Sequence, residues 1–152
     1  MQLKSLKDTQ NLSSNISKIL DVNDIIFLYG EIVVGKTTFV RGLINNLEVE
    51  KGMVKSQILS PTFNIVFDYE IKKLKIMHYD LFRLKNSKGI DELGIFAEIE
   101  DHITLIEWPE LIEKKPKNLI EMFFGYFGEN LEKRNLKIKG YGKWDNYDFK
   151  KI

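Results

Sequence analysis

The chain has 152 residues, of which 43% are hydrophobic and 30% charged, and its formal net charge is +1. We expect a single domain over residues 1–152, because this length and composition suit one hydrophobic core and exclude a disordered chain. The near-neutral charge excludes strong attraction to nucleic acid or anionic membranes, and the lack of cysteine excludes disulfides, thiolate metal sites and cysteine catalysis.

The N-terminal segment, MQLKSLKDTQNLSS, lacks the apolar core of a signal peptide. No run in the chain stays apolar over the length that a bilayer requires, so we expect a cytoplasmic protein without membrane contact. Within residues 8–20, apolar residues recur at helical spacing and predict an amphipathic helix, which Asp8 or Thr9 is expected to cap.

A phosphate-binding loop is predicted next. Residues 25–29, IIFLY, form a continuous apolar run typical of a strand covered on both faces, and residues 37–47 predict a helix. Between them lies GEIVVGKT, which has the G-x-x-x-x-G-K-T spacing whose backbone N–H groups cradle phosphates. Lys36 is expected to bind the β- and γ-phosphates and Thr37 to ligate Mg²⁺. The cradle consists of Gly30, Val33, Val34, Gly35 and Lys36.

Val33 and Val34 are unusual residues for such a loop, where glycine often supplies a positive φ. A β-branched residue held at positive φ costs roughly 1–3 kcal/mol. If that strain fell on the bound form alone, nucleotide affinity would drop by about tenfold to a hundredfold. We therefore expect either a differently bent loop or a strained one, and a Val33→Gly change that tightens nucleotide binding.

The remaining pattern is α/β. Residues 48–56 are expected to form a loop, and residues 64–70 and 74–79 an antiparallel hairpin turning at Lys72-Lys73. A helix with a loop is expected within residues 82–94 and a buried strand at 103–106. Two late strands are expected at 120–127 and 136–139.

Two acids end predicted strands and are candidates for binding Mg²⁺ and positioning water. Asp80 ends IMHYD and Glu107 ends ITLIE, and Trp108, which follows directly, is expected near the nucleotide. In SPTF, Thr62 (with Ser60) lies on a proline-stiffened turn suited to sensing the γ-phosphate. His78 is expected to orient Asp80 or to pack in its strand, and the absence of HExxH spacing argues against zinc.

Four blocks together resemble one family: LYGEIVVGKTTFVRGL, SPTFNIVFDYE, HYDLFRL and DELGIFAEIEDHITLIEWPE are similar to TsaE, formerly YjeE, a small bacterial P-loop ATPase of threonylcarbamoyl-adenosine tRNA modification. The resemblance implies a P-loop NTPase fold with a mixed central β-sheet and flanking helices. It also implies ATP and Mg²⁺ as cofactors and the TsaB–TsaD pair as partner, which modifies N6 of A37 in tRNA, with tRNA met mainly through the complex. The resemblance further implies that ATP hydrolysis resets that complex between turnovers.

The resemblance also implies roles for individual residues. Lys36 would bind phosphates, Thr37 and Glu107 would ligate Mg²⁺, and Thr38 would lie on the α-phosphate side. Asp80 matches the aspartate needed for hydrolysis and Thr62 the switch threonine, while Thr9 and Arg134 fall near positions of nucleotide contacts.

Two other functions remain open. The family usually has G-[DEN]-L-G-A-G-K-T where this chain has GEIVVGKT, so a nucleotide-binding scaffold with a degenerate loop and little hydrolysis is one alternative. A P-loop small-molecule kinase is the other, but such kinases need a mobile lid with arginines. Only three of the 23 basic residues here are arginine, and they are scattered along the chain.

Overall fold

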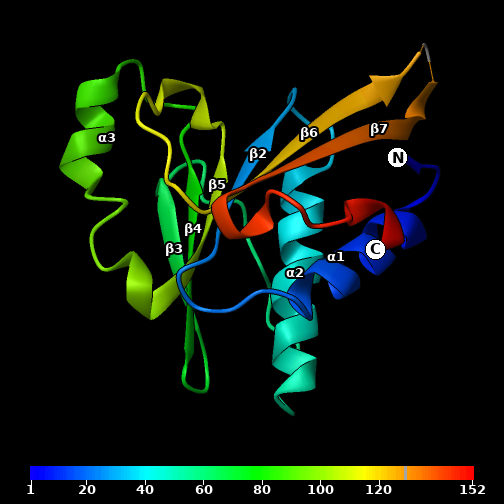
Figure 1. Cartoon of the computed structure of the whole chain (residues 1–152), viewed down its shortest axis with the longest axis horizontal. Coiled ribbons are helices and arrows are strands. Elements are labelled where there is room, and N and C mark those ends of the chain that lie inside the picture. Colours follow the sequence, from blue (N-terminus) through cyan, green and yellow to red (C-terminus); the bar gives the residue numbers. More distant parts are fainter. Residues whose placement is uncertain (129) are drawn as a thin grey trace.

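The structure is a computed structural model that describes residues 1–128 and 130–152. Its strands are β1 (Gln2–Leu3), β2 (Ile25–Tyr29), β3 (Val66–Ile71), β4 (Leu74–Asp80), β5 (His102–Glu107), β6 (Leu119–Phe127) and β7 (Asn130–Tyr141). The α-helices are α1 (Leu6–Ser17), α2 (Lys36–Glu50) and α3 (Ser87–Leu93). Within the described residues, seven strands form one sheet in the order β1-β7-β6-β2-β5-β4-β3 (Figure 1).

The sheet is mixed. Its centre consists of β6, β2, β5 and β4, which run parallel to one another, whereas β3, β7 and β1 each pair antiparallel at the two sides. The phosphate-loop segment joins β2, in the middle of this sheet, to α2. Ligands of open α/β sheets bind at the carboxyl ends of the parallel strands, so this topology directs attention to the ends of β2, β4 and β5.

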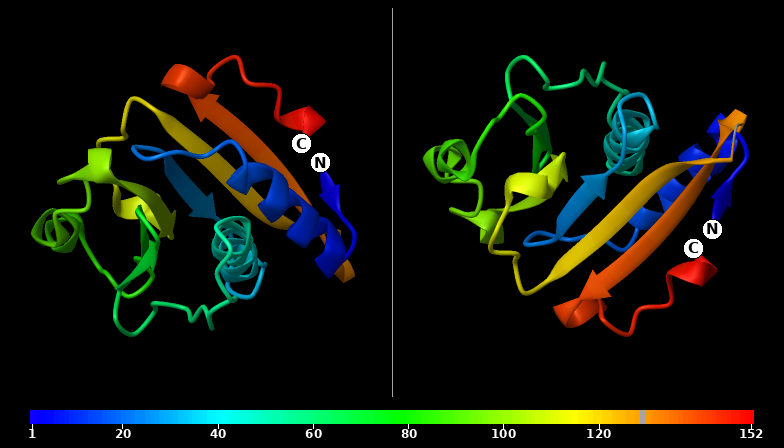
Figure 2. Two further views of the ribbon diagram at one scale, coloured as in Figure 1. Left: turned by 90° about the horizontal axis from the view of Figure 1, so that it is seen from below. Right: turned by 90° about the horizontal axis from the view of Figure 1, so that it is seen from above.

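Two hydrophobic clusters cover opposite faces of β2, because successive side chains of a strand alternate. Ile26 and Leu28 pack with residues of α1 and α2, including Phe39. Ile25 and Phe27 pack with the α3 side of the molecule. Figure 2 shows α1 in front of β6 and β7 when seen from below and behind them when seen from above, so α1 covers one face of this strand pair.

Most expected elements are present, with different bounds. The strand at 25–29 and the hairpin of β3 and β4 are confirmed, whereas α2 extends three residues into the segment expected to be a loop. The cap of α1 was wrongly assigned to Asp8 or Thr9: Ser5 caps the helix, because its side chain accepts a hydrogen bond from the backbone N–H of Asp8. Strand β7 is much longer than the predicted 136–139, and β1 was not predicted.

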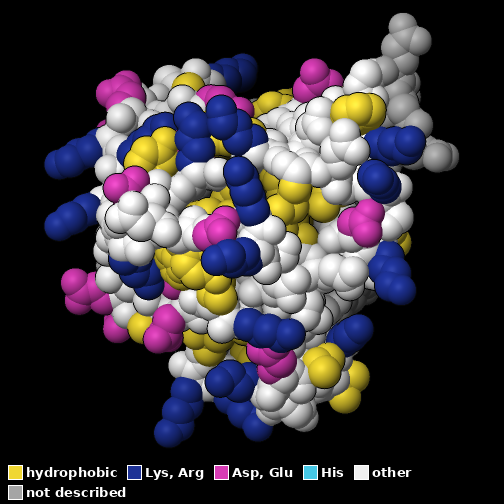
Figure 3. Space-filling model, turned by 45° about the vertical axis from the view of Figure 1, so that its right-hand side comes forward, with side chains coloured by type: hydrophobic (Ala, Val, Ile, Leu, Met, Phe, Trp, Pro, Cys, Tyr) yellow, Lys and Arg dark blue, Asp and Glu magenta, His cyan; other side chains and the backbone are white. Residues whose placement is uncertain are grey.

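Surface charge is mixed. On the face shown in Figure 3, lysine and arginine side chains are scattered, with acidic side chains between them. Within residues 1–128 and 130–152, no helix has both the length and the apolar character that crossing a bilayer would require.

Candidate nucleotide site

The loop between β2 and α2 has the backbone of an anion cradle. Gly30 and Gly35 both have positive φ, 135° and 117°. A Cβ atom at Gly30 would lie 2.4 Å from the carbonyl oxygen of Phe124, so the turn requires glycine there. Gly35 is the N-cap of α2 and provides no side-chain cap, which leaves the first amides of the helix directed at the loop.

Val33 is held in the left-handed region, with φ 65°. The sequence left open whether the loop bends differently or is strained, and the structure places a β-branched residue where glycine is favoured, so the loop is strained. The two valines differ in their surroundings. Val33 is 82% exposed, whereas Val34 is buried in the main hydrophobic cluster.

Lys36, the first residue of α2, spans the loop. Its ammonium donates hydrogen bonds to the carbonyl oxygens of Gly30 and Glu31, the latter at 2.9 Å. The ammonium also lies 4.0 Å from the centroid of the Trp108 ring. Burial lowers the pKa of Lys36, while the carboxylates of Glu107 and Asp80 act in the opposite direction.

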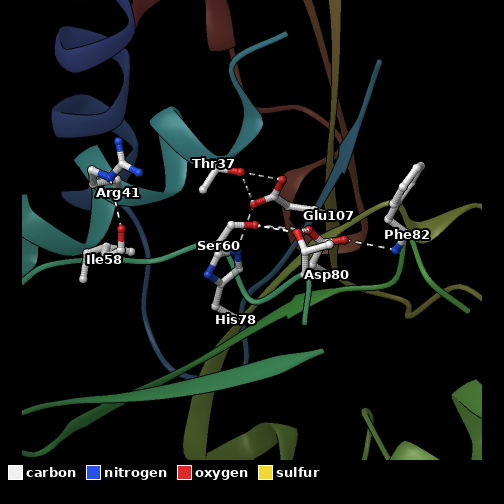
Figure 4. Close-up of polar contacts among 9 residues, drawn as sticks. Thr37, Arg41, Ile58, Ser60, His78, Asp80, Phe82 and Glu107 are labelled. Carbon is white, nitrogen blue, oxygen red and sulfur yellow. Dashed lines mark hydrogen bonds and ion pairs between the residues drawn. The ribbon is translucent and has the colours of Figure 1, made fainter. Parts of the chain in front are cut away.

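Glu107, at the end of β5, lies against the start of α2. The hydroxyl of Thr37 donates to both of its carboxylate oxygens at 3.0 Å (Figure 4). On its other side, Nε2 of His78 lies 2.9 Å from the Oε1 atom. Glu107 and His78 are both buried. His78 packs within β4, as one of the two expectations had it, but it contacts Glu107 and not Asp80, so the other expectation was wrong.

Asp80 ends β4 directly beside Glu107, because the two residues are register partners on parallel strands. Its Oδ2 atom accepts a hydrogen bond from the Thr62 hydroxyl at 2.7 Å, and its Oδ1 atom accepts one from the backbone N–H of Phe82 at 3.0 Å. The Ser60 hydroxyl lies 2.8 Å from that of Thr62. The SPTF turn is thus tied to the strand-end acid (Figure 4).

Helix α2 also holds the chain that leads into this turn. Nε of Arg41 donates to the carbonyl oxygen of Ile58 at 3.1 Å, and the Glu48 carboxylate accepts hydrogen bonds from both the hydroxyl and the backbone N–H of Ser56. Burial would raise the pKa of Glu48, but the hydrogen bonds from Ser56 and Asn45 outweigh it and lower this pKa. Two side chains of α2, Arg41 and Glu48, therefore hold the segment that precedes the SPTF turn against the helix that begins at the phosphate loop.

A cavity of about 280 Å³ lies among these groups. Of the residues singled out in the sequence, it brings together Val33, Val34, Gly35, Lys36, Thr37, Thr38, Ser60, Thr62, Asp80, Glu107 and Trp108. Three other residues that were expected to contact the nucleotide do not line it. Gly30 forms the base of the loop, Thr9 is buried within α1, and Arg134 donates from Nε to the carbonyl oxygen of Val34 at 2.8 Å.

Two further residues line the cavity that the sequence argument did not select, Ile32 and Phe82. Phe82 packs against Trp108, with ring centroids 4.8 Å apart. A usable signal was present for Phe82, because it lies two residues beyond the strand-end acid Asp80. The contact from His78 to Glu107 needed knowledge that β4 and β5 are neighbours, which the sequence alone did not provide.

The polar groups at this edge of the sheet suit Mg²⁺ bound together with a nucleotide. They do not suit a metal ion whose ligands are all protein side chains. Thr37 and Glu107 offer oxygen atoms, the ligands that Mg²⁺ prefers. In the described part of the chain, no group of three or more histidine, aspartate or glutamate side chains is placed to hold a metal. Mg²⁺ typically takes one or two protein ligands and completes its shell with phosphate and water oxygens. This donor set therefore suits a Mg²⁺ ion that arrives with a nucleotide.

Comparison with known proteins gives consistent matches. The family model described as "Threonylcarbamoyl adenosine biosynthesis protein TsaE" matches residues 3–135. Two curated proteins described as tRNA threonylcarbamoyladenosine biosynthesis protein TsaE are similar. The protein of Rickettsia prowazekii (strain Madrid E) is 37% identical over 111 residues, 73% of this chain and 74% of the relative. That of Aquifex aeolicus (strain VF5) is 33% identical over 141 residues, 93% and 94% of the two chains.

Among solved structures, the crystal structure of YdiB, a Bacillus protein, superposes with a TM-score of 0.73 and 22% sequence identity. The match covers 95% of this chain and 86% of YdiB. At that identity the likeness shows the fold alone. Together with the mixed sheet and the loop between β2 and α2, it confirms the predicted α/β P-loop NTPase fold.

Proposed function

The chain belongs to the TsaE family of threonylcarbamoyl adenosine biosynthesis proteins, and from this premise we propose that it is a Mg²⁺-dependent ATPase that serves the tRNA N6-threonylcarbamoyladenosine modification complex. The observation that carries the proposal is the contact between Thr37 and Glu107. It joins the hydroxyl that follows the phosphate-loop lysine to a strand-end acid, which is the pairing that holds Mg²⁺ in P-loop enzymes.

In this proposal, the loop and the N-terminus of α2 bind the phosphates, Lys36 neutralises the β- and γ-phosphates, and Thr38 lies on the α-phosphate side. Lys36 now donates to the carbonyl oxygens of Gly30 and Glu31, so its ammonium is already placed over the cradle. Thr37 and Glu107 would hold Mg²⁺, which supplies charge neutralisation at the phosphates when bound.

Asp80 would position the attacking water. Its carboxylate is oriented by hydrogen bonds from Thr62 and from the backbone of Phe82, so it is fixed before any substrate binds. Thr62 would report on the γ-phosphate through the same hydrogen bond. A change at the phosphate end would then reach the SPTF turn and the surface around it.

The surface around the cavity supports a partner-dependent activity. Ile32 is 58% exposed, Val33 is 82% exposed, and Phe63, beside the switch threonine, is 85% exposed. Exposed apolar side chains grouped near a site are typical of a protein interface. We assign the partner as the TsaB–TsaD pair, which ATP hydrolysis would reset between turnovers, with tRNA met mainly through that complex in the cytoplasm.

Two alternatives remain to be tested against this function. A scaffold with a degenerate loop would bind nucleotide without turning it over, and the strain at Val33 is the observation that favours it. A small-molecule kinase is less well supported. This chain has three arginines, all of them within the described residues, and none of them lines the cavity, where a kinase would need one.

The deciding experiment measures ATP turnover by the purified chain alone, with purified TsaB–TsaD, and with TsaB–TsaD and tRNA. Stimulation that requires the partners supports the accessory ATPase. ATP binding by calorimetry without turnover under all three conditions supports the scaffold, and phosphoryl transfer to an added small molecule supports the kinase. Failure of ATP to bind in any mixture would exclude the proposal.

A further inference from the structure

The sheet has a second surface that the nucleotide site does not use. On the face opposite α1, no α-helix of the described chain lies over β6 and β7 when they are seen from above (Figure 2, right). This face carries the odd-numbered residues of both strands, because Phe123 pairs with Lys137 and Gly125 with Asn135 in the antiparallel register. We call Phe123, Gly125, Asn135, Lys137 and Lys139 the lysine–aromatic face.

The aromatic part of this face is rigid. Phe123 stacks on Tyr29 of the neighbouring strand β2, with ring centroids 4.6 Å apart and planes at 8°. The Tyr29 hydroxyl donates to the buried carboxylate of Glu121 at 2.8 Å. Glu121 also accepts hydrogen bonds from Tyr141 and Lys115. The two half-buried rings are thus held against each other, and the Glu121 carboxylate next to Tyr29 accepts hydrogen bonds from three donors.

Beside these rings the surface is hollow. Gly125 follows Phe123 on the same face, and a Cβ atom placed on Gly125 would meet nothing within 4 Å. A shallow cavity of about 400 Å³ extends from Phe123 over Gly125 to Asn135 and Lys137 on β7. It offers an aromatic wall, a floor without a side chain and an amide that can both donate and accept hydrogen bonds.

The charged part of the face is basic. Lys137 and Lys139 are exposed, and the ammonium of Lys139 lies 5.6 Å from the centroid of the Phe123 ring. The alternating positions of β7 from 133 to 141 read Lys, Asn, Lys, Lys and Tyr, so no acid interrupts them. On a chain whose net charge is only +1, this local grouping of lysines is a distinct feature.

We propose that the lysine–aromatic face binds a single-stranded segment of RNA, with one unpaired base in the hollow beside Phe123 and the flanking phosphates at Lys137 and Lys139. Open sheets with aromatic side chains and basic neighbours bind single strands in this way, because bases pack on the rings while cations follow the backbone. The choice of RNA over DNA rests on the proposed function.

An acidic protein segment fits the face less well. Carboxylates would satisfy the lysines, but a peptide has no planar group that needs a hollow bounded by an aromatic ring and a glycine. Lysine contributes point charge without reading a particular base. The face is therefore expected to bind single strands with little sequence preference and with a strong dependence on salt.

The test uses the full chain and a fluorescein-labelled single-stranded RNA of about ten nucleotides, within the range of such sites. Fluorescence anisotropy at low salt is expected to give a Kd on the order of 10–100 μM. Gly125→Val should weaken binding by about tenfold or more, because it fills the hollow and removes the base contact. The variant should still fold, since a Cβ atom at this position meets nothing within 4 Å and valine favours strands.

A second variant tests the lysines. Lys137→Ala/Lys139→Ala should reduce the slope of log Kd against log salt by about 1.4, the value for two lost phosphate contacts on a single strand. The matched control, Lys51→Ala/Lys73→Ala, removes the same charge at exposed positions outside this face and should leave affinity and slope unchanged.

Several outcomes would overturn the inference: no RNA binding by the wild type, equal affinity of Gly125→Val, or equal effects of the two lysine pairs. Binding of duplex RNA or poly-glutamate as tight as that of the single strand would identify a general polyanion or protein surface instead. ATP binding is measured on every variant in parallel. A variant that loses RNA binding with ATP binding intact supports this face. A wild type that binds ATP but no RNA rejects this face alone, whereas a wild type that binds RNA but no ATP rejects the proposed function alone.

Discussion

Asp80 and Glu107 are register partners at the ends of the parallel strands β4 and β5, yet their carboxylates have different hydrogen-bond donors. Glu107 accepts hydrogen bonds from Thr37 and faces His78, whereas Asp80 accepts them from Thr62 and the backbone of Phe82. One acid is therefore attached to the start of α2, next to the phosphate loop, and the other to the SPTF turn. This division predicts different consequences when each is neutralised.

Glu107→Gln is expected to weaken ATP binding in the presence of Mg²⁺ by at least about tenfold, because an amide is a poorer ligand for a hard cation than a carboxylate. Calorimetry with and without Mg²⁺ measures the effect. The variant should bind metal-free ATP about as well as the wild type. Equal weakening in both conditions would mean that Glu107 supports the fold of the loop and not the metal.

Asp80→Asn is expected to leave Mg²⁺–ATP affinity nearly unchanged while lowering turnover by about a hundredfold or more, the usual scale for a positioned base or water ligand. The amide oxygen can still accept from the backbone N–H of Phe82, and the amide NH2 can donate to the Thr62 hydroxyl, so the turn should stay in place. Turnover in the presence of TsaB–TsaD is the measurement. A variant that loses affinity and turnover equally would assign Asp80 to nucleotide binding.

Lys36→Ala is expected to abolish detectable ATP binding, because it removes the one cation that lines the cavity in the described part of the chain. The same variant removes a buried ammonium whose pKa burial lowers, but it also leaves the carbonyl oxygens of Gly30 and Glu31 without their donor, so the free energy of unfolding should change little. Calorimetry and urea denaturation test the two statements separately. Lys51→Ala, an exposed change past the end of α2, is the control.

Local patterns predicted the elements that position the site, and long-range pairing accounts for what was missed. The apolar run at 25–29 and the glycine spacing that follows it located β2, the loop and the start of α2, because their conformation depends on nearby residues. Asp80 and Glu107 were selected because each follows a buried strand. That they lie side by side depends on β4 pairing with β5, which are separated in the chain by α3.

The errors have physical reasons of the same kind. Strand β1 has two residues and too little pattern of its own, and it forms only because β7 offers an edge. The cap of α1 was misplaced because Asp8 and Ser5 are both good capping residues, and the hydrogen bond that decides between them is visible only in three dimensions. Strand β7 is long because β6 pairs with it along its length, a tertiary effect.

Val33→Gly is expected to stabilise the protein. Relief of strain at a φ of 65° is worth roughly 1–3 kcal/mol, and the extra backbone freedom of glycine offsets roughly 0.5–1 kcal/mol of it. Urea denaturation should therefore give a higher free energy of unfolding. Val34→Gly is the matched control and should destabilise the fold, because Val34 is buried in the core.

The same variant tests the expectation of tighter ATP binding. A lower Kd for Val33→Gly would show that the loop must strain further to hold phosphate. An unchanged Kd would mean that the loop is equally strained with and without nucleotide, so that the strain cancels from the binding equilibrium. A higher Kd would contradict both, and would mean that the valine side chain contributes to the nucleotide site.

Stability is expected to fall as the pH drops below about 6.5, the ordinary pKa of histidine. Burial lowers the pKa of His102, and the ammonium of Lys75, its register partner on β4, acts in the same direction against Asp101 and Glu98. At pH values between the lowered pKa of His102 in the folded chain and its ordinary pKa in the unfolded chain, the unfolded chain binds a proton that the folded chain does not. Acid therefore favours unfolding.

Urea denaturation at about pH 7.5 and about pH 5.5 measures this loss. His102→Asn should reduce the difference between the two values, because it removes the titrating group, whatever its effect on stability at either pH. A difference of the same size in the variant would assign the pH dependence to another residue.

His78 is expected to act through Glu107. Its Nε2–H can donate to the carboxylate at 2.9 Å, and within the described chain its Nδ1 atom has no hydrogen-bond partner, so the ring's one evident polar role is to fix Glu107 against Thr37. Partners behind a metal ligand typically change metal affinity by about tenfold to a hundredfold when removed. His78→Leu should therefore raise the Mg²⁺ concentration needed for half-maximal ATP binding by that factor.

His78→Gln keeps an N–H donor within reach of Glu107 and should recover much of the loss. If both variants needed the same Mg²⁺ concentration as the wild type, the contact would serve packing alone. If both failed equally, with Glu107→Gln milder than either, His78 would hold the strand pair together and not the carboxylate.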